Sequence, residues 1–448
     1  MKQDTFKTIA RSARHFLSGT VLSRVTGLIR DVATAYAFGA DASVAAFLVA
    51  FRFSHLFRRI LGEGALQGAF TPRYEKLKHE DPVQAALFYR DLQYGLGSLL
   101  FVFILFSIGI LQFANGWSGL SAGNHEIILL TTYLMPGLFF ICLYGLNASL
   151  LQCESKYLLS SAVPSLLNLG WTVGVLLLTG LPSAQAMPWL ALCVVLATGL
   201  QWAATVPACR SIVHKLAPQM AWRSWDIYSL NVKALVKPML LTIAGVAATQ
   251  VNSATDALFA RYADLEGPAY LWYAIRLQQL PLALFGIAIG NAILPPLARA
   301  AREGNQERFQ SFIRYAWKAT LALMIPITLG IFLFGGWAIQ LIFGHGDFNS
   351  QDAAMTFYCL EGYAIGLIPS ALVICHLQGF FARGDYKTPM RASLGSVVCN
   401  TFLNALFIFG LGWGSVSVAI ATGISAWVNL GLFYVFRPKL SPLFGEAT

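Results

Sequence analysis

The stretch GLGSLLFVFILFSIGILQFA, residues 95–114, decides which class of protein this chain belongs to. It contains no charged side chain, and about 20 consecutive apolar residues are what an α-helix needs to cross a bilayer. Its residues do not alternate between apolar and polar with the period of a barrel strand. A helix satisfies its own backbone hydrogen bonds in lipid, so the stretch predicts a transmembrane α-helix.

The composition extends this interpretation to the whole chain. Of 448 residues, 56% are hydrophobic and only 12% are charged, whereas soluble domains average about 25% charged residues. We therefore expect an all-α polytopic membrane protein. The apolar runs predict twelve transmembrane helices, and the internal repeat and the family resemblance described below imply two six-helix lobes around a central cavity. The apolar runs place the spans at 15–38, 42–62, 84–113, 126–151, 158–180, 187–209, 233–260, 268–296, 314–336, 353–382, 389–411 and 414–436.

Basic residues fall in every second connection between these spans. The alternate connections contain a single basic residue, Arg261. Because cytoplasmic connections are enriched in lysine and arginine, we expect both termini to be cytoplasmic. The net charge of +10 then reflects this bias, and we expect no nucleic-acid partner. The basic set comprises Lys2, Lys7, Arg11, Arg14, Arg73, Lys76, Lys78, Lys156, Arg210, Lys215, Arg223, Arg299, Arg302, Arg308, Arg383, Lys387, Arg437 and Lys439.

An internal repeat divides the chain. Arg52, Gly62 and Pro72 are spaced by ten residues each, and the same spacing recurs 224 residues later, at Arg276, Gly286 and Pro296. We expect an N-terminal lobe at 1–210, a cytoplasmic linker at 211–232 and a C-terminal lobe at 233–448. Within the linker, MAWRSWDIYSL (220–230) fits either an interfacial amphipathic helix or a solvated connection.

Six arginines lie within the expected spans. An isolated arginine at the bilayer centre costs about 2.5–3.5 kcal/mol, so these side chains have to face water, one another or acidic groups, or else reach the membrane surface. Arg24 and Asp31 share one helix face, and Arg59 and Glu63 are four residues apart. Three alternatives stay open: snorkelling, buried structural ion pairs, and a cationic cavity for an anion such as phosphate. The six are Arg24, Arg30, Arg52, Arg58, Arg59 and Arg276.

A second polar group lies in the seventh and eleventh spans. Asp256 follows Gln250 and Asn252, and Asn400 and Asn404 are four residues apart. Oxygen ligands of this kind suit a small hard cation, although buried amides and carboxylates often only bridge helices. The sequence has no nucleotide-binding loop, zinc-ligand spacing or nucleophile triad, so we predict neither an enzyme nor an ATP-driven pump.

Five stretches together resemble the MurJ (MviN) family of bacterial lipid II flippases, within the multidrug/oligosaccharidyl-lipid/polysaccharide (MOP) exporter superfamily. The resemblance covers about residues 10–436. The stretches are SRVTGLIRD (23–31), FRFSHLFRRILGEGALQGAFTP (51–72), PSLLNLG (164–170), YAIRLQQLPLALFGIAIGNAILP (273–295) and FARGDYKTP (381–389).

The resemblance implies alternating access in the bacterial inner membrane. The implied substrate is the undecaprenyl-pyrophosphate-linked peptidoglycan precursor, which moves to the outer leaflet. The implied sodium positions are Asp256, Asn400 and Asn404, the last of which is a carboxylate in members that bind sodium. The chain also departs from the family at Ala45 and Ile275, where acidic residues are common. The expected headgroup-binding set is Ser23, Arg24, Arg30, Asp31, Arg52, Arg58, Glu63 and Arg276.

Three other functions stay open on the sequence. The twelve-span duplicated layout also fits flippases for other polyprenyl-linked oligosaccharides and MATE-like ion-coupled exporters, although a MATE-like cavity for cationic drugs would be acidic. The third alternative is a non-transporting scaffold for the cell-wall synthesis machinery. The expected partners are membrane lipids, the lipid-linked substrate and, in the scaffold alternative, that machinery. We expect no cofactor, and coupling either to a sodium ion or to the membrane potential.

Overall fold

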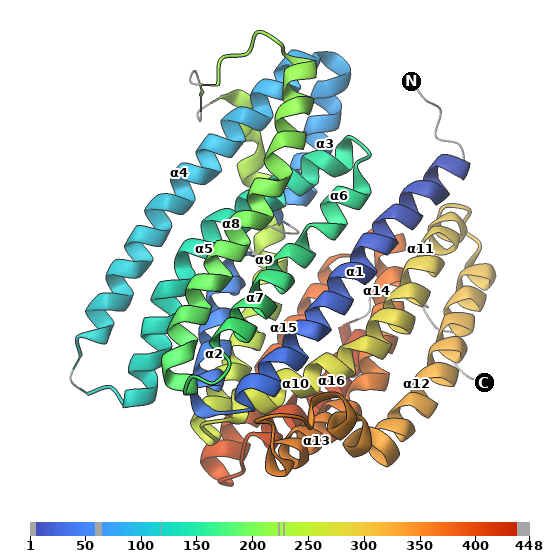
Figure 1. The fold of residues 1–448 in the computed structure, drawn as a ribbon. Helices are drawn as coiled ribbons and strands as arrows, with labels where there is room; N and C mark the ends of the chain where they lie inside the picture. The colour runs from blue at the N-terminus through green and yellow to red at the C-terminus, as the bar shows by residue number, and fades with distance from the viewer. Residues whose placement is uncertain (1–5, 59–64, 118, 223–224, 227–228, 437–448) are drawn as a thin grey trace. The chain divides into compact units, whose positions relative to one another are not determined.

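The computed structural model describes residues 6–58, 65–117, 119–222, 225–226 and 229–436. All secondary structure in these residues is helical, which confirms the expected all-α class (Figure 1). The helices of the first half are α1 (Phe6–Phe38), α2 (Ala42–Phe57), α3 (Ala65–Glu80), α4 (Pro82–Asn115), α5 (Ala122–Cys153), α6 (Tyr157–Ala162), α7 (Pro164–Leu178) and α8 (Ser183–Leu216). Those of the second half are α9 (Leu230–Ala263), α10 (Gly267–Pro281), η2 (Leu282–Gly286), α11 (Ile287–Arg302), α12 (Gln306–Phe343), α13 (Ser350–Ile365), α14 (Leu367–Ala382), α15 (Lys387–Ala405), η3 (Leu406–Gly410) and α16 (Val416–Phe436).

The expected spans fall on these helices. Among the described residues, eight helices are long and apolar enough to cross a membrane, or nine if α13 and α14, bent by 41°, form one span. The helices α1, α2 and α9 do not reach this threshold. For α2 the reason is its length of 16 residues, and for α1 it is the polar and charged side chains between Ser18 and Thr34. The twelve-helix layout is thus consistent with the structure.

The connection between the second and third spans differs from expectation because it contains a helix, α3. Its side chains Leu66, Phe70 and Tyr74 are buried, and the helix packs on α4 and α5. Phe70 stacks on Phe88 of α4 with 5.5 Å between ring centroids. A connection with three apolar or aromatic side chains on one face forms a helix because that face can be buried.

Contact clustering divides the chain into two units. Unit 1 comprises Met1–Phe38 and Ala46–Gln250, and unit 2 comprises Gly39–Ala45 and Val251–Thr448. The boundary between the two units falls inside α9, between Gln250 and Val251. In the connection at 211–232, the described residues between Leu216 and Leu230 are not helical.

In unit 1, α5 is the central helix (Figure 1). It packs on α4 and α8, while α1 packs on α6 and α7. The core beside α7 is aromatic: the ring of Trp171 lies 5.2 Å from Phe47 and 4.8 Å from Phe51, measured between centroids and edge-on in both cases. This cluster fixes α2 against the face of α7 that also meets α1.

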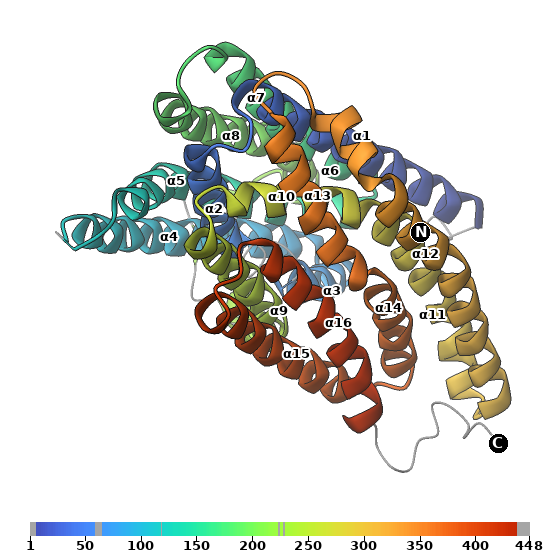
Figure 2. The ribbon, with the colours of Figure 1, turned by 90° about the horizontal axis from the view of Figure 1, so that it is seen from below.

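In unit 2, α16 packs on α13 and α15, and α11 packs on α12 and α14 (Figure 2). The approach of α13 to α16 depends on small residues. A Cβ atom at Gly366 would lie 2.8 Å from the Cα of Gly423, which is closer than real contacts allow. Glycine at both positions lets the two backbones touch, as is common between membrane helices.

The repeat appears in the element boundaries. Shifting α2 by the offset between Arg52 and Arg276 places its last residue, Phe57, on Pro281, where α10 ends. The same shift places Glu80, the end of α3, two residues beyond Arg302, the end of α11. The ends of α2 and α3 thus lie at or near the positions that correspond, after this shift, to the ends of α10 and α11.

Candidate functional site

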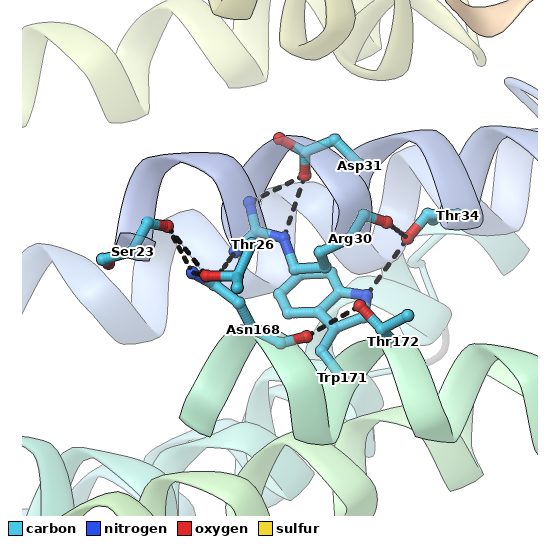
Figure 3. Close-up of polar contacts among 8 residues, drawn as sticks. All are labelled: Ser23, Thr26, Arg30, Asp31, Thr34, Asn168, Trp171 and Thr172. Carbon is cyan, nitrogen blue, oxygen red and sulfur yellow. Dashed lines mark hydrogen bonds and ion pairs between the residues drawn. The ribbon is translucent and has the colours of Figure 1, made fainter. Parts of the chain in front are cut away.

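A buried ion pair between Arg30 and Asp31 is the centre of the polar network on α1 (Figure 3). The two residues are only 6% and 2% exposed. Arg30 donates from Nε and Nη2 to the same oxygen, Oδ1 of Asp31, at 3.0 and 2.7 Å. The charge of this arginine is therefore balanced within α1 itself.

Asn168 of α7 joins this pair to the rest of α1. Its Oδ1 accepts a hydrogen bond from Nη1 of Arg30 at 3.0 Å. Its Nδ2 donates to the backbone oxygen of Ser23 at 2.9 Å and to Oγ1 of Thr26 at 3.2 Å. Both ends of the amide are thus engaged, and Figure 3 shows the side chain reaching from α7 to α1. Ser23 belongs to the expected binding set, and its backbone oxygen already accepts this hydrogen bond from Asn168.

Trp171, three residues after Asn168 on α7, completes the network. The guanidinium carbon of Arg30 lies 4.5 Å from the centre of its ring, in the range of a cation–π contact. The indole Nε1 donates to Oγ1 of Thr34 at 3.2 Å, and that hydroxyl donates to the backbone oxygen of Arg30 at 2.8 Å. Arg30 thus matches the structural alternative, a buried ion pair that joins two helices.

Arg24 differs from Arg30 in its surroundings. Its side chain is exposed, and among the described residues it forms neither a hydrogen bond nor an ion pair. It is seven residues before Asp31 and shares its helix face, but the carboxylate is already paired with Arg30. Arg24 is therefore the uncompensated positive charge in this part of α1.

The remaining members of the expected set are on other helices. Arg52 of α2 and Arg58, directly after it, are half-buried, as is Arg276 of α10. The guanidinium carbon of Arg276 lies 4.2 Å from the ring centre of Trp272, one turn earlier on its own helix. None of these three arginines is without a partner. The expected Glu63 and the neighbouring Arg59 lie outside the described residues.

Unit 2 contains the second predicted cluster, and the structure brings its residues together. Asn404 of α15 donates from Nδ2 to Oδ1 of Asp256 on α9 at 2.8 Å and to Oδ1 of Asn400 at 3.0 Å. Asn252 and Thr422 each donate to the other carboxylate oxygen of Asp256, at 3.3 and 3.5 Å. Three helices, α9, α15 and α16, meet through these contacts.

The oxygens of this cluster fit a small hard cation once the side-chain amide of Asn404 is rotated. Oδ1 of Asn404 is buried and has no partner among the described residues, and Asn404 is 0% exposed. A half-turn of the amide exchanges Oδ1 for Nδ2 and turns this oxygen toward Asp256 and Asn400. Carboxylate, amide and hydroxyl oxygens would then converge, as hard cations prefer. Within the described residues, no group of three or more His, Cys, Asp or Glu side chains is arranged to hold a metal.

The sequence interpretation missed a second buried pair, Arg90–Asp91 of α4, although Arg90 lies within the expected span 84–113. Both residues are 5–6% exposed, and Arg90 donates from Nε and Nη2 to Oδ1 of Asp91 at 2.9 and 2.7 Å. The Arg-Asp dipeptide that both pairs share was the available signal. Asn168 and Trp171 were also missed as partners of Arg30, because a single sequence does not show which helices touch.

Comparison with known proteins gives a consistent result. A family model described as lipid II flippase MurJ matches residues 34–447. A probable lipid II flippase MurJ of Chlamydia muridarum is 31% identical over 447 residues, which cover 99% of this chain and 81% of that protein. The corresponding protein of Vibrio cholerae is 31% identical over 432 residues, covering 93% and 80%. Each of these relatives is named as a flippase and not as an enzyme.

Two solved structures share the fold. A lipid II flippase MurJ in an inward closed conformation superposes with a TM-score of 0.78 at 23% identity, covering 94% of this chain and 86% of that one. An inward-facing MATE family multidrug resistance transporter of the MOP superfamily superposes with a TM-score of 0.72 at 16% identity, covering 95% and 97%. At these identities the likeness concerns the fold alone.

Proposed function

The chain belongs to the MurJ family of lipid II flippases, and from this premise we propose that it moves lipid II across the bacterial inner membrane. In this proposal the undecaprenyl-pyrophosphate-linked precursor passes from the cytoplasmic to the outer leaflet for peptidoglycan synthesis. The single observation that supports it most is the family match over residues 34–447. We further propose that both termini lie in the cytoplasm, which the distribution of basic connections supports.

The proposed ligand for the pyrophosphate is the set of arginines outside the Arg30 network. Arginine suits phosphate because its planar fork donates two parallel hydrogen bonds. Arg24 supports this role because it is exposed and has no hydrogen bond or ion pair among the described residues. Arg52, Arg58 and Arg276 are the further proposed donors, and they would have to exchange their present contacts for the phosphate oxygens.

Arg30 and Asp31 have a different proposed role. Their charges compensate one another, and Asn168 and Trp171 hold the guanidinium in place. A charge paired and hydrogen-bonded in this way contributes little attraction to an approaching anion. We assign to the pair the positioning of α1, and hence of Arg24, which lies nearly two turns earlier on the same helix.

Alternating access is proposed as the mechanism of transport. A ligand shifts a conformational equilibrium only by the difference between its affinities for the two states. An anion that neutralises several arginines at once binds more tightly where those arginines converge, and so favours that state. The membrane potential is a proposed second driving force, since moving one charge through 100 mV is worth about 2.3 kcal/mol.

A sodium ion is the proposed alternative for energy coupling. The chain would hold it with the oxygens of Asp256, Asn400, Asn404 and Thr422, and the buried Oδ1 of Asn404 supports this assignment. When bound, the ion would supply a positive charge that balances the carboxylate of Asp256. With one carboxylate in the cluster, a monovalent ion leaves the site neutral.

Reconstitution tests the proposed function. The full-length chain is placed in liposomes that contain fluorescent lipid II, and the fraction of label accessible from outside is followed over time. We expect accessibility to change faster than in protein-free liposomes. Liposomes with another polyprenyl-pyrophosphate-linked oligosaccharide test the related alternative. If the chain moves neither lipid, the flippase proposal is wrong, and the scaffold alternative gains support.

A further inference from the structure

A cavity of about 510 Å³ lies between α4, α5 and α8 in unit 1. None of its lining residues belongs to the Arg30 network. The cavity exists because α4 and α8 both pack closely on α5 but touch one another little. Its volume is within the range of about 300–1,000 Å³ that is typical of small-molecule sites.

The walls of the cavity are mainly apolar, include six aromatic side chains, and open toward lipid. Phe101 and Val102 of α4 line it and are themselves 58% and 64% exposed. They belong to the uncharged, mainly apolar stretch 95–114, which predicts a lipid-facing surface. An occupant that enters from this side is therefore apolar along much of its length. The aromatic lining residues are Tyr89, Tyr94, Phe101, Phe139, Trp202 and Trp222.

One wall comes from the connection that follows α8. Trp222 belongs to this connection and lines the cavity, and the residues beside it are fixed to α4 by the buried Arg90–Asp91 pair. The described residues of this connection thus have defined contacts with α4. These are Arg90 Nη1 to the backbone oxygen of Ala221 at 2.8 Å, the backbone nitrogen of Asp226 to Asp91 Oδ1 at 3.2 Å, and Trp225 stacked on Tyr94 at 5.5 Å.

The polar end of the cavity is at Arg210, the single charged residue among the described lining residues. Its side chain is exposed, and it forms no hydrogen bond or ion pair with the described residues. The deeper polar groups are already satisfied, because Tyr89 donates to Asn147 at 2.7 Å and Asn147 donates to Thr205 at 2.8 Å. The indole Nε1 of Trp202 is buried without such a partner. A ligand here therefore has its charge at Arg210 and its apolar part along the aromatic walls.

We propose that this cavity binds an anionic diacyl phospholipid of the leaflet that faces the basic connections. One acyl chain lies among the aromatic side chains, and the phosphate lies at Arg210. Moving an acyl chain from the bilayer into an equally apolar cavity changes its free energy little. The selectivity between lipids therefore comes from the headgroup. One arginine near the surface gives an anionic lipid about a fivefold advantage over a zwitterionic lipid with the same chains.

Native mass spectrometry of the purified full-length chain tests this proposal. The chain is titrated in detergent with phosphatidylglycerol or with phosphatidylcholine of identical acyl chains. We expect the tightest site to prefer phosphatidylglycerol by about fivefold. Arg210→Gln is expected to abolish the preference, whereas Lys215→Gln, which removes an exposed cation of the same helix outside the cavity lining, is expected to keep it.

A second pair of variants tests the location of the acyl chain. Gly97 of α4 lines the cavity, and a Cβ atom there would make ordinary contact with Phe139 at 3.7 Å. Gly97→Leu should fill the space and remove the tightest lipid. Gly109→Leu, on the same helix where a Cβ atom meets nothing within 4 Å, should leave binding unchanged.

Three results would overturn the proposal. The first is a preference for phosphatidylglycerol that survives Arg210→Gln or falls equally with Lys215→Gln, since the charge of the whole surface would then be responsible. The second is unchanged lipid binding by Gly97→Leu. The third is displacement of the bound lipid by sub-stoichiometric lipid II, which would assign the cavity to the transported substrate.

Discussion

Arg30 and Asp31 are neighbours in sequence, and two nitrogens of the arginine bind one oxygen of the aspartate, at 3.0 and 2.7 Å. The pair Arg90–Asp91 repeats this geometry at 2.9 and 2.7 Å. In both pairs the arginine side chain folds back along its own helix and then reaches a second segment. Adjacent Arg-Asp residues within apolar helices of this chain thus act as neutral connectors between segments.

A double-mutant cycle on Arg30 and Asp31 tests the neutral connector. Removing one partner of a buried ion pair leaves an uncompensated charge and costs about 3–5 kcal/mol, whereas replacing both by apolar residues is often nearly neutral. We expect Arg30→Met alone to lower the unfolding midpoint of the purified protein strongly. The double variant Arg30→Met/Asp31→Leu is expected to recover much of the loss. A double variant less stable than either single variant would contradict the connector role.

Replacing Asn168 by alanine tests the bridge between α1 and α7. The change removes the acceptor of Arg30 Nη1 and two donor contacts to α1. A buried donor left without a partner costs about 1–3 kcal/mol, so the thermal midpoint should fall. Asn429→Ala is the matched control, because its Oδ1 is buried without a partner among the described residues. Equal midpoints for both variants would show that the bridge adds no stability.

Sodium-dependent stability tests the cluster around Asp256. An ion that binds only the folded state stabilises it by about 2.7 kcal/mol at a hundred times its dissociation constant. We expect the midpoint to be higher in sodium chloride than in choline chloride of equal ionic strength. Asn404→Leu should abolish this difference, and Asn404→Asp, which adds a second carboxylate, should produce it at lower sodium. A wild-type midpoint that is the same in both salts would exclude a coupling role for sodium at this cluster.

Tyr74 of α3, outside the membrane-spanning segments, gives a prediction at high pH. Burial, and to a lesser degree the carboxylate of Glu154, raises the pKa of Tyr74 well above its usual value, so its hydroxyl stays protonated and donates to Glu154 at 2.9 Å. Because the folded-state pKa is raised, this contribution to stability is fully present below the unfolded pKa of about 10 and is lost as pH rises beyond it. The stability difference between wild type and Tyr74→Phe should therefore shrink above about pH 10. A difference that stays constant to pH 11 would contradict this.

The membrane helices could be predicted from the sequence because hydropathy and loop charge are local properties. The stretch 95–114 indicated α4 directly, and the spacing of Arg52 and Arg276 indicated the repeat that the boundaries of α2 and α10 display. Asp256, Asn400 and Asn404 are in hydrogen-bond contact, as expected for polar side chains in apolar helices, which face the interior of the protein and pair with one another.

The partners of the charged residues could not be predicted, because they depend on which helices touch. The pairing of Arg30 with its direct neighbour was hidden by helical geometry, since adjacent residues point about 100° apart and only a folded-back side chain joins them. The helix α3 was missed because its apolar residues are few and separated by Arg73, Lys76 and Lys78. Its burial comes from α4 and α5 rather than from its own hydropathy.

The flipping rate of Arg24→Gln tests most directly whether Arg24 binds the pyrophosphate of lipid II during transport. Fluorescent lipid II is reconstituted with the wild type, with Arg24→Gln or with Arg308→Gln, which removes an exposed arginine paired with Glu303 at 3.5 Å. We expect Arg24→Gln to lose most of the protein-dependent transport while its unfolding midpoint stays at the wild-type value, and we expect Arg308→Gln to transport normally. Transport by Arg24→Gln at the wild-type rate would contradict the account.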